Sequence, residues 1–389
     1  MVTIRAPVAD DGVGVRSVPF IPCPRGVAAE ELSAPPQAAD ALKEVARLAR
    51  PALADSLLDD YVAAVEPATD LVAFVSAPRR KLERTFGVRN LELPVSRLCS
   101  TDGFRLFFAH IVRHADAFAQ AYNAALDAHR AAHAITNPVE PSPNLDRSGG
   151  RIELPFWAWG AGEERRPLHV TVEDGRSLIH HGRPAPVELP GGPAPEVLDA
   201  LRRIERAGLK IRPRALAMTL FFRLFCCDLF IHGIGGARYE RVNDRILAGF
   251  FGVDPPPPYA AASATLLLTP TAPVPTEKDA VELQQTVRRM KQTPERFVDA
   301  YLPDDAEARE LGRRRIELLD MDALTKRERR KAYAEAQAIA GRLQERMRPH
   351  ILAAEKEARR LDAARALAED RTYPFFFHPR GRLERLYEQ

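Results

Sequence analysis

The sequence is poor in cysteine and in net charge, and each shortage excludes a class of protein. Its four cysteines show no Cys-x-x-Cys spacing, so neither a zinc knuckle nor a disulfide framework is expected. The 56 basic and 53 acidic residues leave a net charge of only +3. This balance argues against a general nucleic-acid-binding protein, because such proteins concentrate an excess of Lys and Arg.

Long hydrophobic runs are also lacking. No window approaches the roughly eighteen consecutive apolar residues that a membrane span requires. The first residues, MVTIRAPVADDGVG, have no apolar stretch behind a basic start, so a signal peptide is not expected. We therefore expect a cytoplasmic protein that binds neither membranes nor nucleic acid.

The remaining composition is that of a globular protein, with 46% hydrophobic and 28% charged residues. A chain of 389 residues is longer than one hydrophobic core usually fills, so several structural regions are expected. We predict a mainly helical region over 1–136 and an α/β core with a βαβ unit over 137–275. A helical hairpin over 276–371 and a C-terminal segment over 372–389 that docks on the core complete the prediction.

The N-terminal region is predicted to hold amphipathic helices around 38–66 and 101–135. The second carries two His-x-x-x-His pairs, a spacing that places both rings of a pair on one helix face. The pairs are His110 with His114 and His129 with His133. We interpret them as polar-face histidines and predict no metal site, since further ligands would have to come from elsewhere. Cys226 and Cys227, in the run TLFFRLFCCDLFI, are expected to be buried thiols.

Residues 137–198 combine turn sequences with short apolar stretches and are predicted to be β-rich. RIELPFWAW, PLHVTV and RSLIHH have the length and composition of strands. Trp157 and Trp159 alternate with Ala158, so at least one face of that strand should be buried.

The region that follows predicts a βαβ unit. Helices are expected at about 196–207 and 214–224, then a strand that ends at Ile231, a helix that stops at Gly252, and a buried strand, TLLL, at 265–268. A strand, loop, helix, strand order predicts a parallel sheet with helical cover.

The segment DLFIHGIGGARYERVNDRI, residues 228–246, lies where such folds collect ligands. Its glycines allow the backbone to approach a ligand closely, and the backbone amides at the start of the next helix attract anions. His232 would add a titratable donor and Arg238 a fork for phosphate or carboxylate. However, HGIGG fits neither GxGxxG nor the P-loop, and a glycine turn often serves packing alone. A binding loop and a tight turn both remain possible.

The region over 276–371 has helical apolar spacing with long charged faces. Two long helices joined around 320–324 would form an antiparallel coiled-coil hairpin, through which we expect a homodimer. The cluster KRERRK at 326–331 is either a solvated face or a site for an acidic partner. Phe375–Phe377 are too hydrophobic for a free tail.

The order of IRPRALAMTLF, DLFIHGIGGARYERV, PPPPYAAASATLLL, a helical hairpin and FFFHPRGRLER resembles the C-terminal half of the cysteine-adding ligases of bacillithiol biosynthesis. The resemblance starts at about residue 210. Its matching positions are Gly235, Gly236 and Tyr239 in the turn, Ala262 and Ser263 in the following strand, and Gly381, Glu384 and Arg385 at the end. His232 has no counterpart in that pattern.

The resemblance implies an α/β fold with a Rossmann-like parallel core, ATP or ADP as ligand, and amide-bond formation between cysteine and a sugar-linked amine. Amide formation also needs a base or orienting group, and from their place in this segment we expect His232 and Asp228 to act in catalysis. We expect ligand binding by Gly233, Gly235, Gly236, Arg238, Tyr239, Asp244, Ser263 and Arg385, of which Gly235, Gly236, Tyr239, Ser263 and Arg385 match the family's pattern. The function expected from the resemblance is a nucleotide-binding small-molecule ligase or transferase. The alternative is a non-catalytic homologue that acts as a dimeric scaffold through its hairpin.

Overall fold

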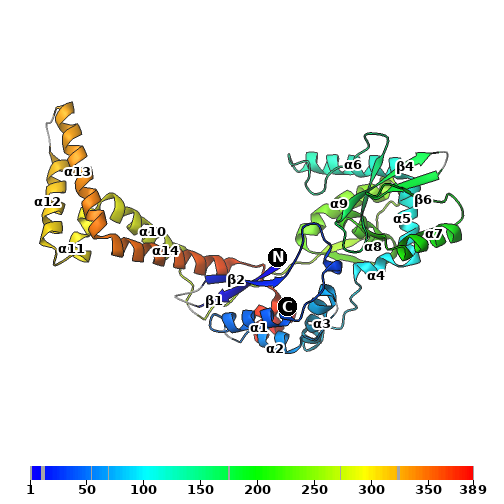
Figure 1. Cartoon of the computed structure of the whole chain (residues 1–389), viewed down its shortest axis with the longest axis horizontal. Coiled ribbons are helices and arrows are strands. Elements are labelled where there is room, and N and C mark those ends of the chain that lie inside the picture. The colour runs from blue at the N-terminus through cyan, green and yellow to red at the C-terminus, as the bar shows by residue number, and fades with distance from the viewer. Residues whose placement is uncertain are drawn as a thin grey trace. The chain divides into compact units, whose positions relative to one another are not determined.

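The computed structural model describes residues 2–9, 14–53, 55–68, 70–173, 176–271, 273–321 and 325–388. The chain divides into two compact units, which are described separately; Figure 1 labels their elements. Unit 1 combines Ile21–Pro35 with Glu66–Thr265, and unit 2 combines Val2–Phe20, Pro36–Val65 and Leu266–Gln389. Each unit is therefore built from segments that are far apart in the sequence.

Unit 1 is built around a curled antiparallel sheet of five strands in the order β6-β5-β4-β3-β7. The strands are β3 (Ile152–Trp159), β4 (Arg166–Glu173), β5 (Arg176–His180), β6 (Val187–Leu189) and β7 (Lys210–Pro213). The first three confirm the strands predicted from RIELPFWAW, PLHVTV and RSLIHH. Turn-rich connections between them are long enough for antiparallel neighbours and too short for parallel crossovers.

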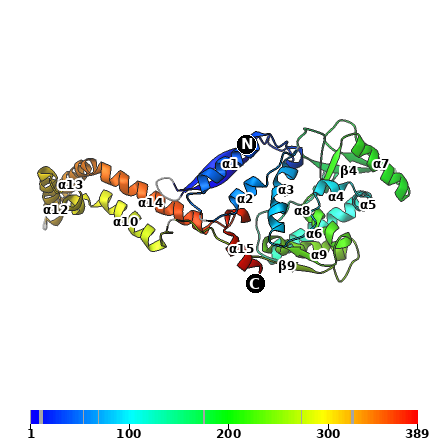
Figure 2. The same cartoon turned by 90° about the horizontal axis from the view of Figure 1, so that it is seen from below.

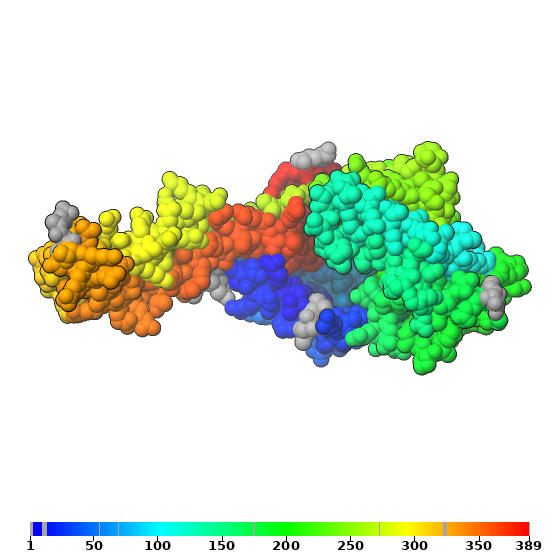
Figure 3. Space-filling model, turned by 90° about the horizontal axis from the view of Figure 1, so that it is seen from above, coloured from blue at the N-terminus to red at the C-terminus, as the bar shows by residue number. Residues whose placement is uncertain are grey.

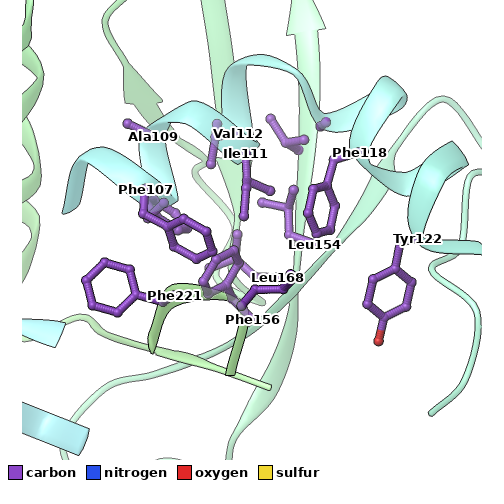
Figure 4. Close-up of a cluster of buried hydrophobic side chains, with 14 of the residues drawn as sticks. Phe107, Ala109, Ile111, Val112, Phe118, Tyr122, Leu154, Phe156, Leu168 and Phe221 are labelled. Atoms are coloured by element: carbon purple, nitrogen blue, oxygen red, sulfur yellow. The ribbon is translucent and has the colours of Figure 1, made fainter. Parts of the chain in front are cut away.

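Helices cover one face of this sheet and form the core of unit 1. Leu154, Phe156 and Ala158 of β3 are completely buried, as strand alternation requires. They meet aromatic residues of α5 (Asp102–Arg113) and α8 (Ala215–Phe225), and Figure 4 shows Phe107, Phe156 and Phe221 pointing toward one another. The helix predicted over 101–135 is interrupted at His114, where α5 ends and α6 (Ala115–Ala132) follows.

Further helices of unit 1 carry the surface features considered below. They are η1 (Ala29–Glu31), α3 (Leu71–Arg84), α4 (Val95–Cys99), α7 (Ala194–Arg206) and α9 (Ile234–Gly249).

The expectation of a Rossmann-like parallel core is wrong. In the part of the chain that the structure describes, the parallel pairing is that of β8 (Phe230–His232) with β9 (Tyr259–Ala261), a sheet of two strands joined through α9. Residues 265–268, predicted as the second strand, lie outside any strand. A single βαβ unit predicts one pair of parallel strands and does not determine whether further parallel strands join that pair. In this chain the larger sheet is a separate, antiparallel one.

The expected burial of the vicinal cysteines is also wrong. Cys226 is exposed and Cys227 is partly exposed. Both follow α8, which ends at Phe225, and their neighbour Phe225 is 62% exposed. The apolar run TLFFRLFCCDLFI therefore leaves the core before it reaches the cysteines.

Unit 2 contains a small sheet of β1 (Val2–Val8) and β2 (Gly14–Ile21), packed with α1 (Gln37–Ala49) and α2 (Leu58–Ala63). The C-terminal η3 (Phe375–Phe377) and α15 (Arg380–Tyr387) belong to the same unit. Phe377 is 2% exposed in this cluster, and the Phe376 ring stacks 3.9 Å from that of Tyr61. Leu268 of the TLLL segment packs here as well.

The rest of unit 2 forms a helical arm, α10 to α14. Its helices are α10 (Glu277–Gln292), η2 (Pro294–Phe297), α11 (Val298–Tyr301), α12 (Ala306–Asp320), α13 (Lys326–Arg346) and α14 (Arg348–Glu369). Figures 1 and 2 show α10 beside α14, and α12 beside α13 at the far end.

The contacts of α12 with α13 run antiparallel. Arg314 near the end of α12 pairs with Glu335, at 3.1 Å, whereas Glu307 near its start pairs with Arg342, at 2.6 Å. Residues 322–324, part of the predicted connection, lie outside the described residues. Dimerisation through the hairpin stays a prediction. Within the described ranges, no helix combines the length and apolarity that a membrane crossing needs.

Candidate functional site

The glycine segment 228–246 forms β8, a turn and α9. Gly233 is the N-cap of α9, and Gly235 and Gly236 lie in its first turn. A methyl group on Gly236 would lie 1.7 Å from Cε1 of His232, so the imidazole occupies the space above this glycine. A methyl group on Gly233 or Gly235 would meet nothing within 4 Å. Packing of His232 is therefore sufficient to explain Gly236.

Asp244 takes part in a buried network around Arg223. The Arg223 side chain is 1% exposed and donates to Glu240 at 3.0 Å and to Asp244 at 2.6 Å. Its guanidinium also lies 4.9 Å from the centre of the Tyr259 ring. This network links α8, α9 and β9, so Asp244 has a structural partner. The expected role of Asp244 in ligand binding stays a prediction.

The other predicted binding residues are dispersed. Tyr239 packs against His129, with ring centres 5.9 Å apart. Asp228, Arg238 and Ser263 are exposed on unit 1; Ser263 follows Ala262, whose N–H donates to the His232 carbonyl at 2.9 Å. Arg385 belongs to unit 2. The structure thus brings together His232, Gly236 and the residue before Ser263, and the ligand roles of all these residues stay predictions.

The His-x-x-x-His pairs lie as the spacing requires, with ring centres 4.8 Å apart for His110 and His114 and 4.5 Å for His129 and His133. His129 is buried, which differs from the polar-face interpretation, and its burial lowers its pKa. Within the described ranges, no three His, Cys, Asp or Glu side chains are placed to hold a metal ion.

A cleft of about 900 Å³ on unit 1, which we call the arginine cleft, is a second candidate site. Four parts of the chain form it: η1, one face of α3, the segment from Glu92 through α4, and β7. Its charged and hydroxyl residues are Glu30, Asp70, Ser76, Arg79, Arg80, Glu92, Ser96, Arg97, Ser100, Lys210 and Arg212.

α3 presents Ser76, Arg79 and Arg80 to the cleft because residues three and four apart lie on one helix face. The helix starts at the N-cap Asp70, whose side chain accepts from the Ala73 N–H at 2.8 Å. Glu92 forms ion pairs with both arginines, at 3.8 Å for Arg80, and so holds them on the same side of the cleft.

β7 contributes Lys210 and Arg212, two residues apart and therefore on one face of the strand. Arg212 pairs with Glu30 at 2.9 Å, and its guanidinium lies 5.7 Å from the centre of the Trp159 ring. Lys210 pairs with Glu31.

Glu31 is an ionised anchor beside the cleft. It accepts hydrogen bonds from Lys210 and from the Trp159 indole N–H, the latter at 3.0 Å. Burial alone would raise the pKa of Glu31, but these hydrogen bonds and the Lys210 charge together lower it. The carboxylate is therefore charged at neutral pH and fixes the position of Lys210.

Arg97 differs from the other cations of the cleft. It lies exposed on α4, and within the described ranges its side chain has no ion-pair or hydrogen-bond partner. The guanidinium is thus available to a ligand without breaking an internal pair. The hydroxyls of Ser76 and Ser96 add groups that can donate a hydrogen bond.

The chemistry of the cleft suits an anion. Five cationic side chains line it against three carboxylates, so its lining carries two more positive than negative charges. A volume of about 900 Å³ lies in the upper part of the range for small-molecule sites. Arginine forks match the geometry of phosphate and carboxylate groups.

Sequence interpretation missed this site. Its cations come from residues 79–97 and 210–212, more than a hundred positions apart, and only the fold brings them together. Two local signals exist: the Arg79-Arg80 pair and the alternation of Lys210 and Arg212 along a short strand. Neither distinguishes a ligand site from a solvated charged surface.

Comparisons of the chain with models of protein families, with curated proteins and with solved structures found no match.

Proposed function

We propose that unit 1 binds a small molecule carrying phosphate or carboxylate groups in the arginine cleft. The observation that supports this most strongly is the excess of cations around a cleft of about 900 Å³, with the exposed Arg97 unpaired within the described ranges. An anion that displaced water there would gain charge-assisted hydrogen bonds, which are stronger than neutral ones. This proposal falls in the small-molecule class expected from the sequence.

ATP and ADP, the ligands that the resemblance implies, are suitable first probes because they combine several anionic groups with a size that fits such a cleft. The cleft accounts for binding of an anion but for no bond-forming step. Amide-bond formation, and the roles of His232 and Asp228 in it, therefore stay predictions.

The proposal is tested by titration with ATP, ADP and pyrophosphate, with adenosine as the uncharged control. The chain has 2 tryptophans, Trp157 and Trp159, both in unit 1, and Trp159 contacts Glu31 and Arg212. Binding in the cleft should change their fluorescence. We expect the anions to bind, less tightly at high salt, and adenosine not to bind. Adenosine binding as tightly as ATP, or no binding by any probe, would contradict the proposal.

Two matched variants locate the site. Arg97→Ala should weaken binding about tenfold, the loss expected for one hydrogen bond to a charged group. Arg238→Ala removes another exposed arginine of unit 1, the one at the glycine segment, and should leave the affinity unchanged. The opposite pattern would place the ligand at the glycine segment.

A further inference from the structure

The far end of the arm carries a concentration of cations that the rest of the fold does not use. Five exposed side chains occupy the first turns of α13: Lys326, Arg327, Arg329, Arg330 and Lys331. Within the described ranges, none of them has an ion-pair partner. Glu328, the one carboxylate among them, is engaged in the capping box with Thr325, whose hydroxyl donates to it at 2.7 Å. Five cationic side chains thus stand against one carboxylate over Lys326–Lys331.

The position of these cations is unfavourable for α13 itself. The helix macrodipole favours acidic side chains in the first turn, by about 0.3–1 kcal/mol each, and disfavours basic ones there. The dipole thus gives no reason for Lys326 and Arg327 in the first turn, although Lys and Arg are in general good helix formers. An external anionic partner would supply such a reason.

Two hollows adjoin the cations. One, of about 430 Å³, is lined by Lys326, Arg327, Arg330 and Lys331 with Ala334. The other, of about 510 Å³, is lined by Arg329 and Arg330 and by apolar residues at the end of α12 and in α13. Leu319, Met321 and Tyr333 belong to it and are 46%, 49% and 60% exposed. Figure 3 shows this end of the arm, where α13 is orange.

We propose that this arm end, defined by Lys326–Lys331 together with Leu319, Met321 and Tyr333, is a docking surface for an acidic segment of another protein. The segment would place a large apolar side chain in the hollow beside Tyr333 and carboxylates against Arg327 and Arg330. Such a combination of an apolar anchor with complementary charges is typical of helix-in-groove recognition.

Other occupants fit less well. A second copy of the same surface would bring like charges together, which costs free energy. Membrane binding uses apolar side chains that project into lipid, whereas Leu319, Met321 and Tyr333 line a hollow. A nucleic-acid backbone would match the cations but would leave the apolar lining of the hollow beside Tyr333 without an apolar partner.

Selection from a random peptide library on the immobilised full-length chain tests the proposal. We expect the enriched peptides to combine several Asp or Glu with a large apolar residue. A selected peptide should bind about tenfold more weakly to Arg330→Glu, because reversal removes a charge-assisted contact and adds repulsion. Its affinity should also fall with added salt. Tyr333→Ala should weaken it through loss of the hollow's lining.

Arg288→Glu is the matched control, since Arg288 is an exposed arginine of α10 in the same arm. This variant should bind the peptide like the unmodified chain, and far-ultraviolet circular dichroism should show that both variants keep their helices. Enrichment of neutral or basic peptides, no enrichment at all, or equal binding by Arg330→Glu would overturn the proposal. Tighter binding to phosphatidylserine vesicles or to double-stranded RNA, lost in Arg330→Glu, would overturn it in favour of a membrane or a nucleic acid.

Discussion

The glycine segment and the arginine cleft, both on unit 1, differ in where their polar groups are directed. In the glycine segment, Asp244 is bound to the buried Arg223, and the Gly236 position is overlaid by His232. In the cleft, five cations line an open volume; four of them are held by Glu30, Glu31 and Glu92, and Arg97 is unpaired within the described ranges. A contiguous sequence motif can therefore serve packing, whereas groups distant in the sequence can converge on a ligand-sized space.

Replacement of Arg223 tests whether the polar groups of the glycine segment stabilise the fold, and it should change stability more than any other variant considered. Arg223→Met should lower the free energy of unfolding of unit 1 by about 3–5 kcal/mol, because Glu240 would remain buried without its partner. Urea denaturation followed by tryptophan fluorescence measures this, since both tryptophans lie in unit 1. Arg238→Met, at an exposed position, should stay within about 0.5 kcal/mol of the unmodified chain. A similar small change for Arg223→Met would show that the network is dispensable.

Gly236→Ala separates packing from ligand approach. In a His232→Ala background the added methyl group loses its three nearest contacts, all atoms of the imidazole, and alanine should stabilise α9 by about 0.5–1 kcal/mol over glycine. With His232 present, the imidazole must move, so this gain should disappear or become a loss. Denaturant unfolding of the four combinations measures the coupling. Equal effects of Gly236→Ala in both backgrounds would remove packing as the reason for this glycine.

Stability at acidic pH tests whether the ionised Glu31 holds Lys210 beside the cleft, and the expected change is small. The pKa of Glu31 is lowered in the folded chain, so its ion pair contributes stability above the ordinary value of 4.5, and this contribution is lost as the pH falls through the lowered pKa. Glu31→Gln should therefore cost about 0.5–1 kcal/mol at neutral pH and progressively less below about pH 4.5. Unfolding curves of both chains across this range provide the test. A difference that grew on acidification would contradict the assigned role of Glu31.

Much of the local structure could be predicted from the sequence, but its assembly could not. The alternation around Trp157 and Trp159 correctly indicated strands, because burial of one sheet face leaves a period of two in the chain. The parallel core was wrong because, among the described residues, the short strand ending at His232 pairs with Tyr259–Ala261 alone, in a sheet of two strands. No local pattern records which strands become neighbours in a sheet.

The candidate site was even less accessible to sequence interpretation. Glycines followed by a helix are recognisable in a sequence because they form one contiguous motif. Arg97 and Arg212, in contrast, line the same cleft only after folding. Their local sequences resemble those of ordinary charged surfaces. The excess of positive charge in the cleft is also invisible in the overall composition, which is nearly balanced at +3.

Arginine-selective modification by phenylglyoxal, read by mass spectrometry with and without ATP, tests the central claim most directly. It reports on each guanidinium in the unmodified sequence. If the arginine cleft is the anion site, ATP should protect Arg97 strongly and Arg80 measurably, while Arg238 at the glycine segment should react equally fast in both samples. Protection of Arg238 with unchanged reactivity at Arg97 would contradict the account and return the ligand to the glycine segment.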